Sequence, residues 1–87
     1  MDRKTAINIG LHMQEQVIDL RIPLYVNKMR LKELLVDVFN TMHIQLPLQW
    51  DIQIMNKKIR IHDSIELYRY PLGDGDQFQI VDLTKGA

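Results

Sequence analysis

The segment KMRLKELLVDVFNTMH, residues 28–43, carries the clearest structural signal of this chain. Its apolar residues recur at intervals of three and four positions, the spacing of one face of an α-helix. They are Leu31, Leu34, Leu35, Val38, Phe39 and Met42. Asn27 suits the N-cap position, because its side-chain oxygen can accept a hydrogen bond from an otherwise unpaired backbone N–H. We therefore expect one amphipathic helix from about Lys28 to His43.

Before this helix, two runs of residues alternate between apolar and polar side chains. The first run, residues 5–13, is apolar at every second position: Ile7, Ile9, Leu11 and Met13. The second run, residues 17–22, repeats the pattern and is followed by Pro23; its apolar positions are Ile18, Leu20 and Ile22. A period of two is typical of a strand with one buried face. With a turn at residues 14–16, residues 5–22 are expected to form a β-hairpin.

After the helix, the period of two returns. Trp50, Ile52 and Ile54 predict a third strand. Residues 56–58 are expected to turn the chain into a short fourth strand that carries Ile59 and Ile61.

The rest of the chain predicts a loop and a last strand. We expect residues 63–76 to form a loop with one helical turn, held in place by Leu67, Tyr70 and Leu72. The loop ends in Gly-Asp-Gly-Asp, residues 73–76, which is typical of a turn. A strand over residues 77–83 would place Phe78 and Ile80 on its buried face.

These elements follow the order ββαββ, a loop, and then β. A sheet with one buried face needs one covering layer, and a single amphipathic helix supplies it. We therefore expect an α+β fold of the β-grasp type, with a mixed sheet of about five strands under one helix. Residues 5–83 would form a single domain, with short frayed termini at residues 1–4 and 84–87.

Composition narrows the classes of function. The 87 residues are 46% hydrophobic, and 11 Lys and Arg residues balance 11 Asp and Glu residues. A neutral chain lacks the basic excess that is typical of nucleic-acid binders. Without cysteine, a disulfide scaffold, a thiolate metal site and a thiol nucleophile are excluded. The sequence has neither a secretory signal nor a run long enough to span a membrane, so we expect a cytoplasmic protein.

Two sets of residues resemble known proteins. The spacing of four core residues is similar to that in the second half of ubiquitin: Leu67, Tyr70, Leu72 and Phe78. The segment Asp19-Leu20-Arg21-Ile22-Pro23, the Leu-rich helix and the Gly-Asp-Gly-Asp turn together resemble the YukD/EsaB family. Members of that family are small, ubiquitin-like cytoplasmic proteins that accompany bacterial type VII secretion systems, the exporters of WXG-type substrates.

The resemblance implies a binding module and not an enzyme. It implies an accessory or regulatory role without a cofactor, in which the folded domain docks onto protein components of a membrane-embedded secretion machine. The protein would then lie in the cytoplasm, at the inner face of the membrane through these partners, without inserting into the bilayer.

A modifier or sulfur carrier of the β-grasp type is the alternative function. Such proteins act through a flexible C-terminal tail that ends in Gly-Gly, whose carboxylate is the reacting group. Here the sequence ends in Leu-Thr-Lys-Gly-Ala, residues 83–87, so covalent conjugation is disfavoured.

Histidine, aspartate and serine residues give only weak signals for chemistry. The residues of a catalytic triad occur consecutively at His62, Asp63 and Ser64, but a triad needs its histidine between the other two, so a turn is the better interpretation. His12 and His43 lie too far from His62 and from each other to form a local metal motif. We expect no catalytic residue and no metal ligand.

The helix also supplies the candidate partner-binding residues. Met29, Val36 and His43 are spaced by seven and widen the apolar face beside the core stripe. This band is a broad edge of the core, a site covered by the loop over residues 63–76, or a docking surface, for which methionine is well suited. Self-association through this face or through the edge strands is a further possibility.

Three basic residues surround that band: Lys28, Arg30 and Lys32. They occupy the first helical turns, where the macrodipole favours acidic residues. Basic residues at the positive end of the helix dipole have two explanations. Either they belong to a surface that binds a partner, or the helix is packed well enough to tolerate the unfavourable charges. Because no aromatic residues are interleaved with them, nucleic-acid binding is disfavoured and a solvated surface is expected.

Overall fold

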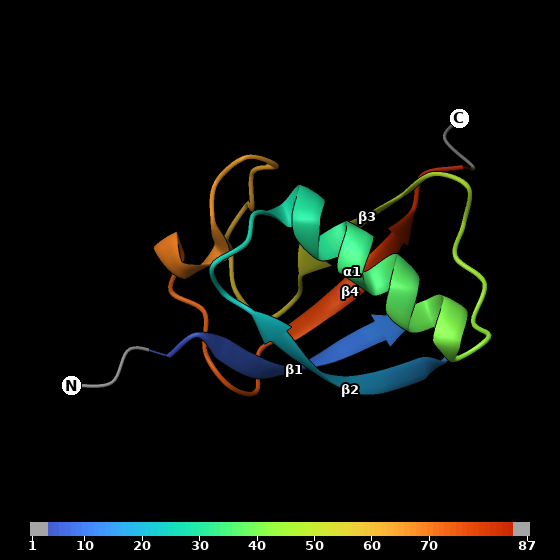
Figure 1. The fold of residues 1–87 in the computed structure, drawn as a ribbon, viewed down its shortest axis with the longest axis horizontal. Coiled ribbons are helices and arrows are strands. Elements are labelled where there is room, and N and C mark those ends of the chain that lie inside the picture. The colour runs from blue at the N-terminus through green and yellow to red at the C-terminus, as the bar shows by residue number, and fades with distance from the viewer. Residues whose placement is uncertain (1–3, 85–87) are drawn as a thin grey trace.

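The computed structural model describes residues 4–84 (Figure 1). Within this range its elements are β1 (Ala6–Met13), β2 (Gln16–Pro23), α1 (Lys28–Thr41), β3 (Trp50–Ile54), a short 3₁₀-helix (Leu67–Arg69) and β4 (Gln77–Asp82). The strands form one mixed sheet in the order β2-β1-β4-β3, in which β1 and β4 are parallel and the other neighbours are antiparallel. Helix α1 lies across one face of this sheet. The predicted β-grasp arrangement is confirmed.

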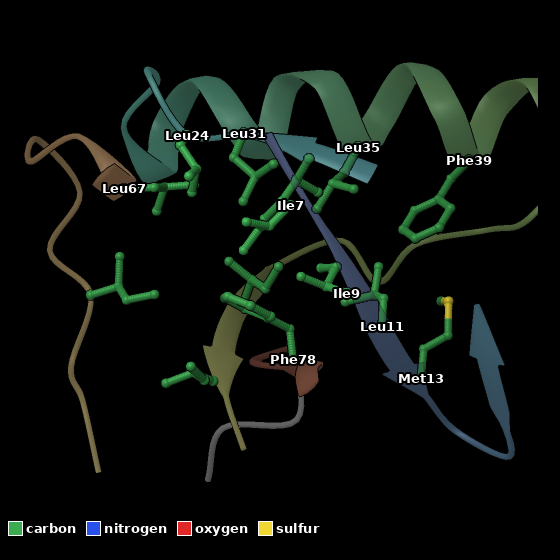
Figure 2. Packing of buried hydrophobic residues seen from close by; sticks show 14 residues of the cluster. Ile7, Ile9, Leu11, Met13, Leu24, Leu31, Leu35, Phe39, Leu67 and Phe78 are labelled. Carbon is green, nitrogen blue, oxygen red and sulfur yellow. The ribbon is translucent and has the colours of Figure 1, made fainter. Parts of the chain in front are cut away.

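The core lies between α1 and the covered face of the sheet (Figure 2). The helix contributes Leu31, Leu35 and Phe39, and β4 contributes Phe78. On β1 every second side chain is buried, as the alternation predicts: Ile7, Ile9, Leu11 and Met13. Complete burial of one such side chain stabilises the fold by about 1.5–3 kcal/mol, so the helix is held mainly by this stripe.

The N-terminal hairpin is confirmed, with a tighter turn than residues 14–16. Met13 pairs with Gln16, so Gln14 and Glu15 alone form the turn. Gln14 has φ of 51°, in the left-handed region that two-residue hairpin turns require. The pairing continues to Ala6 opposite Pro23.

The predicted strand at Ile59 and Ile61 is wrong. Between β3 and the 3₁₀-helix the structure assigns no strand, so the part of the chain that it describes has four strands and not about five. Ile61 is nevertheless buried, and the partly buried Ile59 packs against the core. The alternation of Ile59 and Ile61 therefore reflects side chains that reach the core. The segment that carries them is irregular and does not pair with a neighbouring strand.

The loop over residues 63–76 is confirmed, and Leu67 in its 3₁₀-helix is completely buried. The loop is joined to the segment before α1 by backbone hydrogen bonds, from Leu67 N–H to Val26 O at 2.9 Å and from Tyr68 N–H to Leu24 O at 2.9 Å. These bonds fix the loop beside the start of α1.

The turn at residues 73–76 is organised around the buried carboxylate of Asp76. It accepts hydrogen bonds from Asn56 Nδ2 at 3.0 Å and Gly73 N–H at 2.9 Å, and it pairs with Lys57 Nζ at 2.9 Å. Burial raises the pKa of Asp76, but these contacts outweigh burial and hold the pKa below the ordinary value of 3.8. Gly75 has φ of 89°, a conformation that favours glycine.

Two residues of the segments expected to be frayed are described. Lys4 forms an ion pair with Asp74, and this contact and the Asn8 N–H lower the pKa of the Asp74 carboxyl. Thr84 Oγ1 accepts a hydrogen bond from Gln49 N–H at 3.0 Å. The rest of those segments, and with it most of the C-terminal tail, lies outside the described residues.

Candidate functional site

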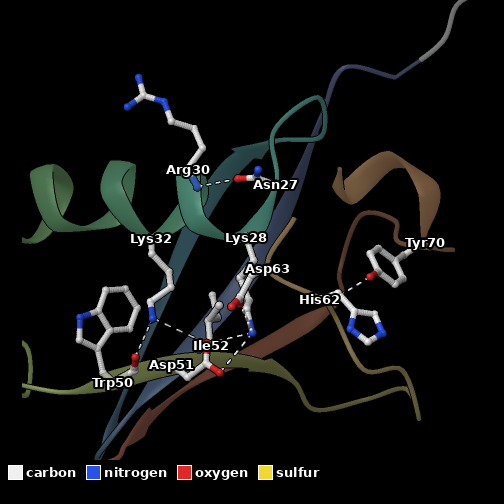
Figure 3. A network of polar contacts seen from close by, with 10 residues as sticks. All are labelled: Asn27, Lys28, Arg30, Lys32, Trp50, Asp51, Ile52, His62, Asp63 and Tyr70. Carbon is white, nitrogen blue, oxygen red and sulfur yellow. Dashed lines mark hydrogen bonds and ion pairs between the residues drawn. The ribbon is translucent and has the colours of Figure 1, made fainter. Parts of the chain in front are cut away.

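The first turn of α1 contains a buried lysine (Figure 3). Lys28 is only 7% exposed, and its Nζ lies 3.1 Å from Asp51 Oδ1 on β3 and 3.2 Å from Asp63 Oδ1 in the loop. The expected solvated surface is therefore wrong for Lys28. Its ammonium group joins the helix, the edge strand β3 and the loop.

Lys32, one turn further along α1, also reaches β3. Its Nζ donates a hydrogen bond to Trp50 O at 2.8 Å and lies 4.8 Å from the centroid of the Trp50 ring. It is 3.8 Å from Asp51 Oδ1, which it shares with Lys28. The two lysines hold the same side of the helix against β3, as Figure 3 shows.

This arrangement explains the basic residues at the helix start. No acidic residue lies in the first turn of α1. The negative charges come instead from Asp51 and Asp63, which are remote in sequence and lie beside the first turn. They offset the unfavourable interaction of Lys28 with the positive end of the helix dipole.

Arg30 is the member of the basic trio that projects into solvent. Its side chain pairs with Glu33 at 2.9 Å, and its backbone N–H donates to the Asn27 side chain at 2.9 Å, which confirms the predicted N-cap. An exposed pair of this kind contributes at most about 1 kcal/mol, so Arg30 can exchange Glu33 for another partner.

Met29 and Val36 lie on the exposed surface of α1. Met29 is 59% exposed and Val36 is 38% exposed, two turns apart on the same side of the helix. Helical periodicity places both next to the Lys32 side, which faces β3. The loop over residues 63–76 leaves both side chains exposed.

His43 does not continue this line. The helix ends at Thr41, two residues before the predicted end, and His43 lies in the following turn with φ of 58°. Its side chain lines a groove of about 580 Å³ at the C-terminal end of α1, between the hairpin turn and the segment before β3. The structure therefore keeps Met29 and Val36 together and separates His43 from them.

An exposed aromatic pair and an exposed leucine were not predicted from the sequence. Beside the helix start, the Tyr25 and Tyr68 rings meet edge to face at 5.0 Å, and the Arg69 guanidinium lies 5.4 Å from the centroid of the Tyr68 ring. Beyond the helix end, Leu48 is 91% exposed. Leu48 follows Pro47 in a segment without periodicity. The one signal in the sequence is that an apolar residue lies outside the predicted helix and strands.

The residues considered for chemistry lie apart. His12 is on β1, with Nε2 2.6 Å from Gln77 Oε1, whereas His62 precedes the 3₁₀-helix and donates its backbone N–H to Tyr70 OH. The Asp63 carboxylate pairs with Lys28, so its contact is with the helix. Across residues 4–84, no three His, Asp or Glu side chains gather closely enough to hold a metal ion.

Comparison with known proteins identifies the fold. No family model and no curated protein matches the sequence. The chain is similar to a solved structure described as "Molecular Mimicry of SUMO promotes DNA repair", with a TM-score of 0.61 and 17% identity over 92% of this chain and 95% of that chain. The fold is ubiquitin-like. Among residues 4–84, neither α1 nor the 3₁₀-helix has the length and apolar character needed to cross a membrane.

Proposed function

We propose that this chain is a non-catalytic, ubiquitin-like protein-binding module. Its role would be that of a cytoplasmic accessory or regulatory component of a type VII secretion system. The ubiquitin-like fold supports the first statement. The second rests on the resemblance of residues 19–23, the helix and the turn at residues 73–76 to the YukD/EsaB family.

One observation carries the proposal: α1 presents apolar side chains to solvent although its opposite side already fills the core. Met29 and Val36 are exposed, while Leu31 and Leu35 are buried. Because Lys28 and Lys32 fix the helix against β3, these exposed residues sit on a rigid element. A preorganised apolar surface costs little entropy when a partner covers it.

The proposed docking surface is smaller than the sequence analysis suggests. It consists of Met29 and Val36, with Arg30 at its rim as the charged contact. Lys28 and Lys32 act behind this surface, because their ammonium groups are engaged with β3. His43 lies beyond the helix end and would contribute only to a partner long enough to reach the groove there.

The partner would be a protein component of the membrane-embedded secretion machine. Docking onto it would bring this module to the inner face of the membrane without its own membrane anchor. Binding would alter the assembly or activity of the machine, since the module itself supplies a surface and no reacting group.

Complementation in the bacterium that encodes the chain tests this role. The gene is deleted and replaced by the wild type, by Val36→Asp or by Thr41→Asp, and export of a WXG-type substrate is measured. Thr41 is also exposed on α1 but lies on a different side of the helix from Met29 and Val36, so Thr41→Asp adds the same charge away from the proposed docking surface and is the matched control. We expect the deletion and Val36→Asp to reduce export, and Thr41→Asp to restore it.

The outcomes separate the two parts of the proposal. Normal export in the deletion strain would contradict the secretion role. Restored export with Val36→Asp, in a strain whose deletion is defective, would contradict the helix surface alone. Equal thermal stability of the purified variants excludes unfolding as the cause.

A further inference from the structure

The two edges of the sheet differ in how their outward-facing backbone groups are satisfied. At the β3 edge, Trp50 O accepts a hydrogen bond from Lys32 Nζ at 2.8 Å, and Ile52 N–H donates to Asp51 Oδ1 at 2.8 Å. Side chains therefore cover these two outward-facing groups, which makes this edge a poorer site for pairing with another strand.

The β2 edge has no such cover. Leu24 N–H donates to Thr5 O at 2.8 Å, just beyond the last pair of the β1–β2 ladder. Hydrogen-bonded pairs alternate in an antiparallel ladder, so Ile22, Leu20 and Ile18 also direct their backbone groups toward β1. Gly10 N–H, which donates to Asp76 O on the other side of β1, agrees with this phase.

The residues between them consequently direct their backbone groups away from the sheet. They are Val17, Asp19 and Arg21, and in residues 4–84 the structure gives their backbone N–H and C=O groups no hydrogen-bond partner. All three are exposed. An edge of this kind is a template for a further strand.

We propose that this further strand is β2 of a second copy of the chain. The two strands would run antiparallel about a twofold axis at Leu20, so that Asp19 of each copy lies opposite Arg21 of the other. Both residues point their backbone groups outward, so each opposed pair exchanges two hydrogen bonds. The result is one continuous sheet across both copies, an isologous interface.

Charge selects this register. The Asp19 and Arg21 side chains share the uncovered face of the sheet, and oppositely charged residues placed directly opposite stabilise a strand pair. A shift by two residues in one direction would place Asp19 opposite Asp19, and a shift in the other direction would place Arg21 opposite Arg21. Like charges directly opposite destabilise the pair, so only the register centred on Leu20 is complementary.

Proline is compatible with the same register. Pro23 would lie opposite Val17, at the end of the paired segment, where its C=O accepts and its missing N–H costs one terminal bond. In the register with Arg21 opposite Arg21, Pro23 would instead face Asp19 and remove a bond from within the segment.

The covered face supplies apolar contacts in this arrangement. Leu20 would meet Leu20, and Ile18 would meet Ile22 of the second copy. Leu20 and Ile18 are only partly buried in the single chain and already pack against the core. Pairing would remove their remaining exposed surface from water, which favours association.

Charge reversal tests the proposed pairing. Sedimentation equilibrium over a wide range of concentrations measures the dimerisation constant of the wild type, of Asp19→Arg and of Arg21→Asp. Each variant alone places like charges opposite each other. An equimolar mixture restores opposite charges at both pairs, because Asp19→Arg carries arginine at both positions and Arg21→Asp carries aspartate at both.

We expect the wild type to dimerise. Each variant alone should have a dimerisation constant about tenfold weaker, as the energies of cross-strand charge pairs indicate. The mixture should form heterodimers with an affinity close to that of the wild type. Asp37→Arg, which reverses an exposed charge on α1, is the matched control and should dimerise normally. A wild type that stays monomeric up to about millimolar concentration, or single variants that dimerise like the wild type, would overturn the proposal.

Discussion

Lys28 and Asp51 form an ion pair, 3.1 Å from Nζ to Oδ1, that joins the first turn of α1 to the edge strand β3. The same ammonium group lies 3.2 Å from Asp63 Oδ1 in the loop before the 3₁₀-helix. One side chain therefore fixes the orientation of the helix that carries the proposed docking surface. The stability of the fold and the placement of the proposed docking surface therefore depend on the same contact.

Replacement of Lys28 tests this link. Lys28→Met keeps the apolar stem but leaves Asp51 and Asp63 without their buried partner, so we expect the free energy of unfolding to fall by about 1–2 kcal/mol. The partial exposure of both carboxylates keeps the loss below that of a fully buried pair. Arg30→Met, at an exposed pair, should change it by less than about 0.5 kcal/mol. Urea denaturation measures both, and equal losses would contradict the assignment.

Lys32 provides a spectroscopic test of the covered β3 edge. Lys32→Met removes the hydrogen bond to Trp50 O and the charge beside the Trp50 ring. We expect a change in tryptophan fluorescence, which reports this site directly because the chain has a single tryptophan. Stability should fall by about 1 kcal/mol. Lys58→Met, at an exposed residue, should leave the spectrum unchanged, and an unchanged spectrum for Lys32→Met would contradict the contact.

Gly10 is explained by the side chain that lies over it. A Cβ at this position would overlap Gln77 Oε1, which also lies 2.6 Å from His12 Nε2. We expect Gly10→Ala to destabilise the protein by about 1–2 kcal/mol, because Gln77 must move and lose this hydrogen bond. In a Gln77→Ala background the same change should be neutral or slightly stabilising. A double-mutant cycle measures the difference, and additive effects would show that Gln77 is not the obstacle.

Asp76 predicts a specific acid sensitivity. Its pKa is lower in the folded protein than the ordinary value of 3.8, so its ionised form stabilises the fold. This contribution is complete above about pH 4 and is lost as the pH falls through the lowered pKa. We expect the difference in unfolding free energy between the wild type and Asp76→Asn to be constant near neutral pH and to shrink below about pH 4. A difference that grows on acidification would contradict the sign of the shift.

Much of the fold could be predicted because periodicity reports burial. The helix, the hairpin, β3 and β4 each bury one face over several residues, and the alternation or the helical spacing follows from that. Ile59 and Ile61 show the limit of this argument. Their spacing correctly indicates contact with the core, but a strand also needs a neighbouring strand, which no local pattern specifies.

The candidate site could be predicted only in part, for a similar reason. Met29 and Val36 follow from helical geometry, and both are exposed as a docking surface requires. The burial of Lys28 depends on Asp51 and Asp63, which are distant in sequence. The sequence does contain one indication of this burial: Lys28 lies on the same helical stripe as Leu31 and Leu35. A charged residue on a core stripe needs a buried partner. The spacing of seven between Met29, Val36 and His43 likewise does not reveal that the helix ends at Thr41, before His43.

The most direct test of the central claim is quantitative co-purification from detergent-solubilised membranes of the organism that encodes this chain. Tagged wild type, Val36→Asp and Thr41→Asp are compared by the amount of type VII secretion components that each retains. We predict that the wild type and Thr41→Asp retain such a component equally, and that Val36→Asp retains at least about tenfold less, as expected for a residue central to an interface. Equal retention by Val36→Asp, or a wild type that retains no secretion component, would contradict the account.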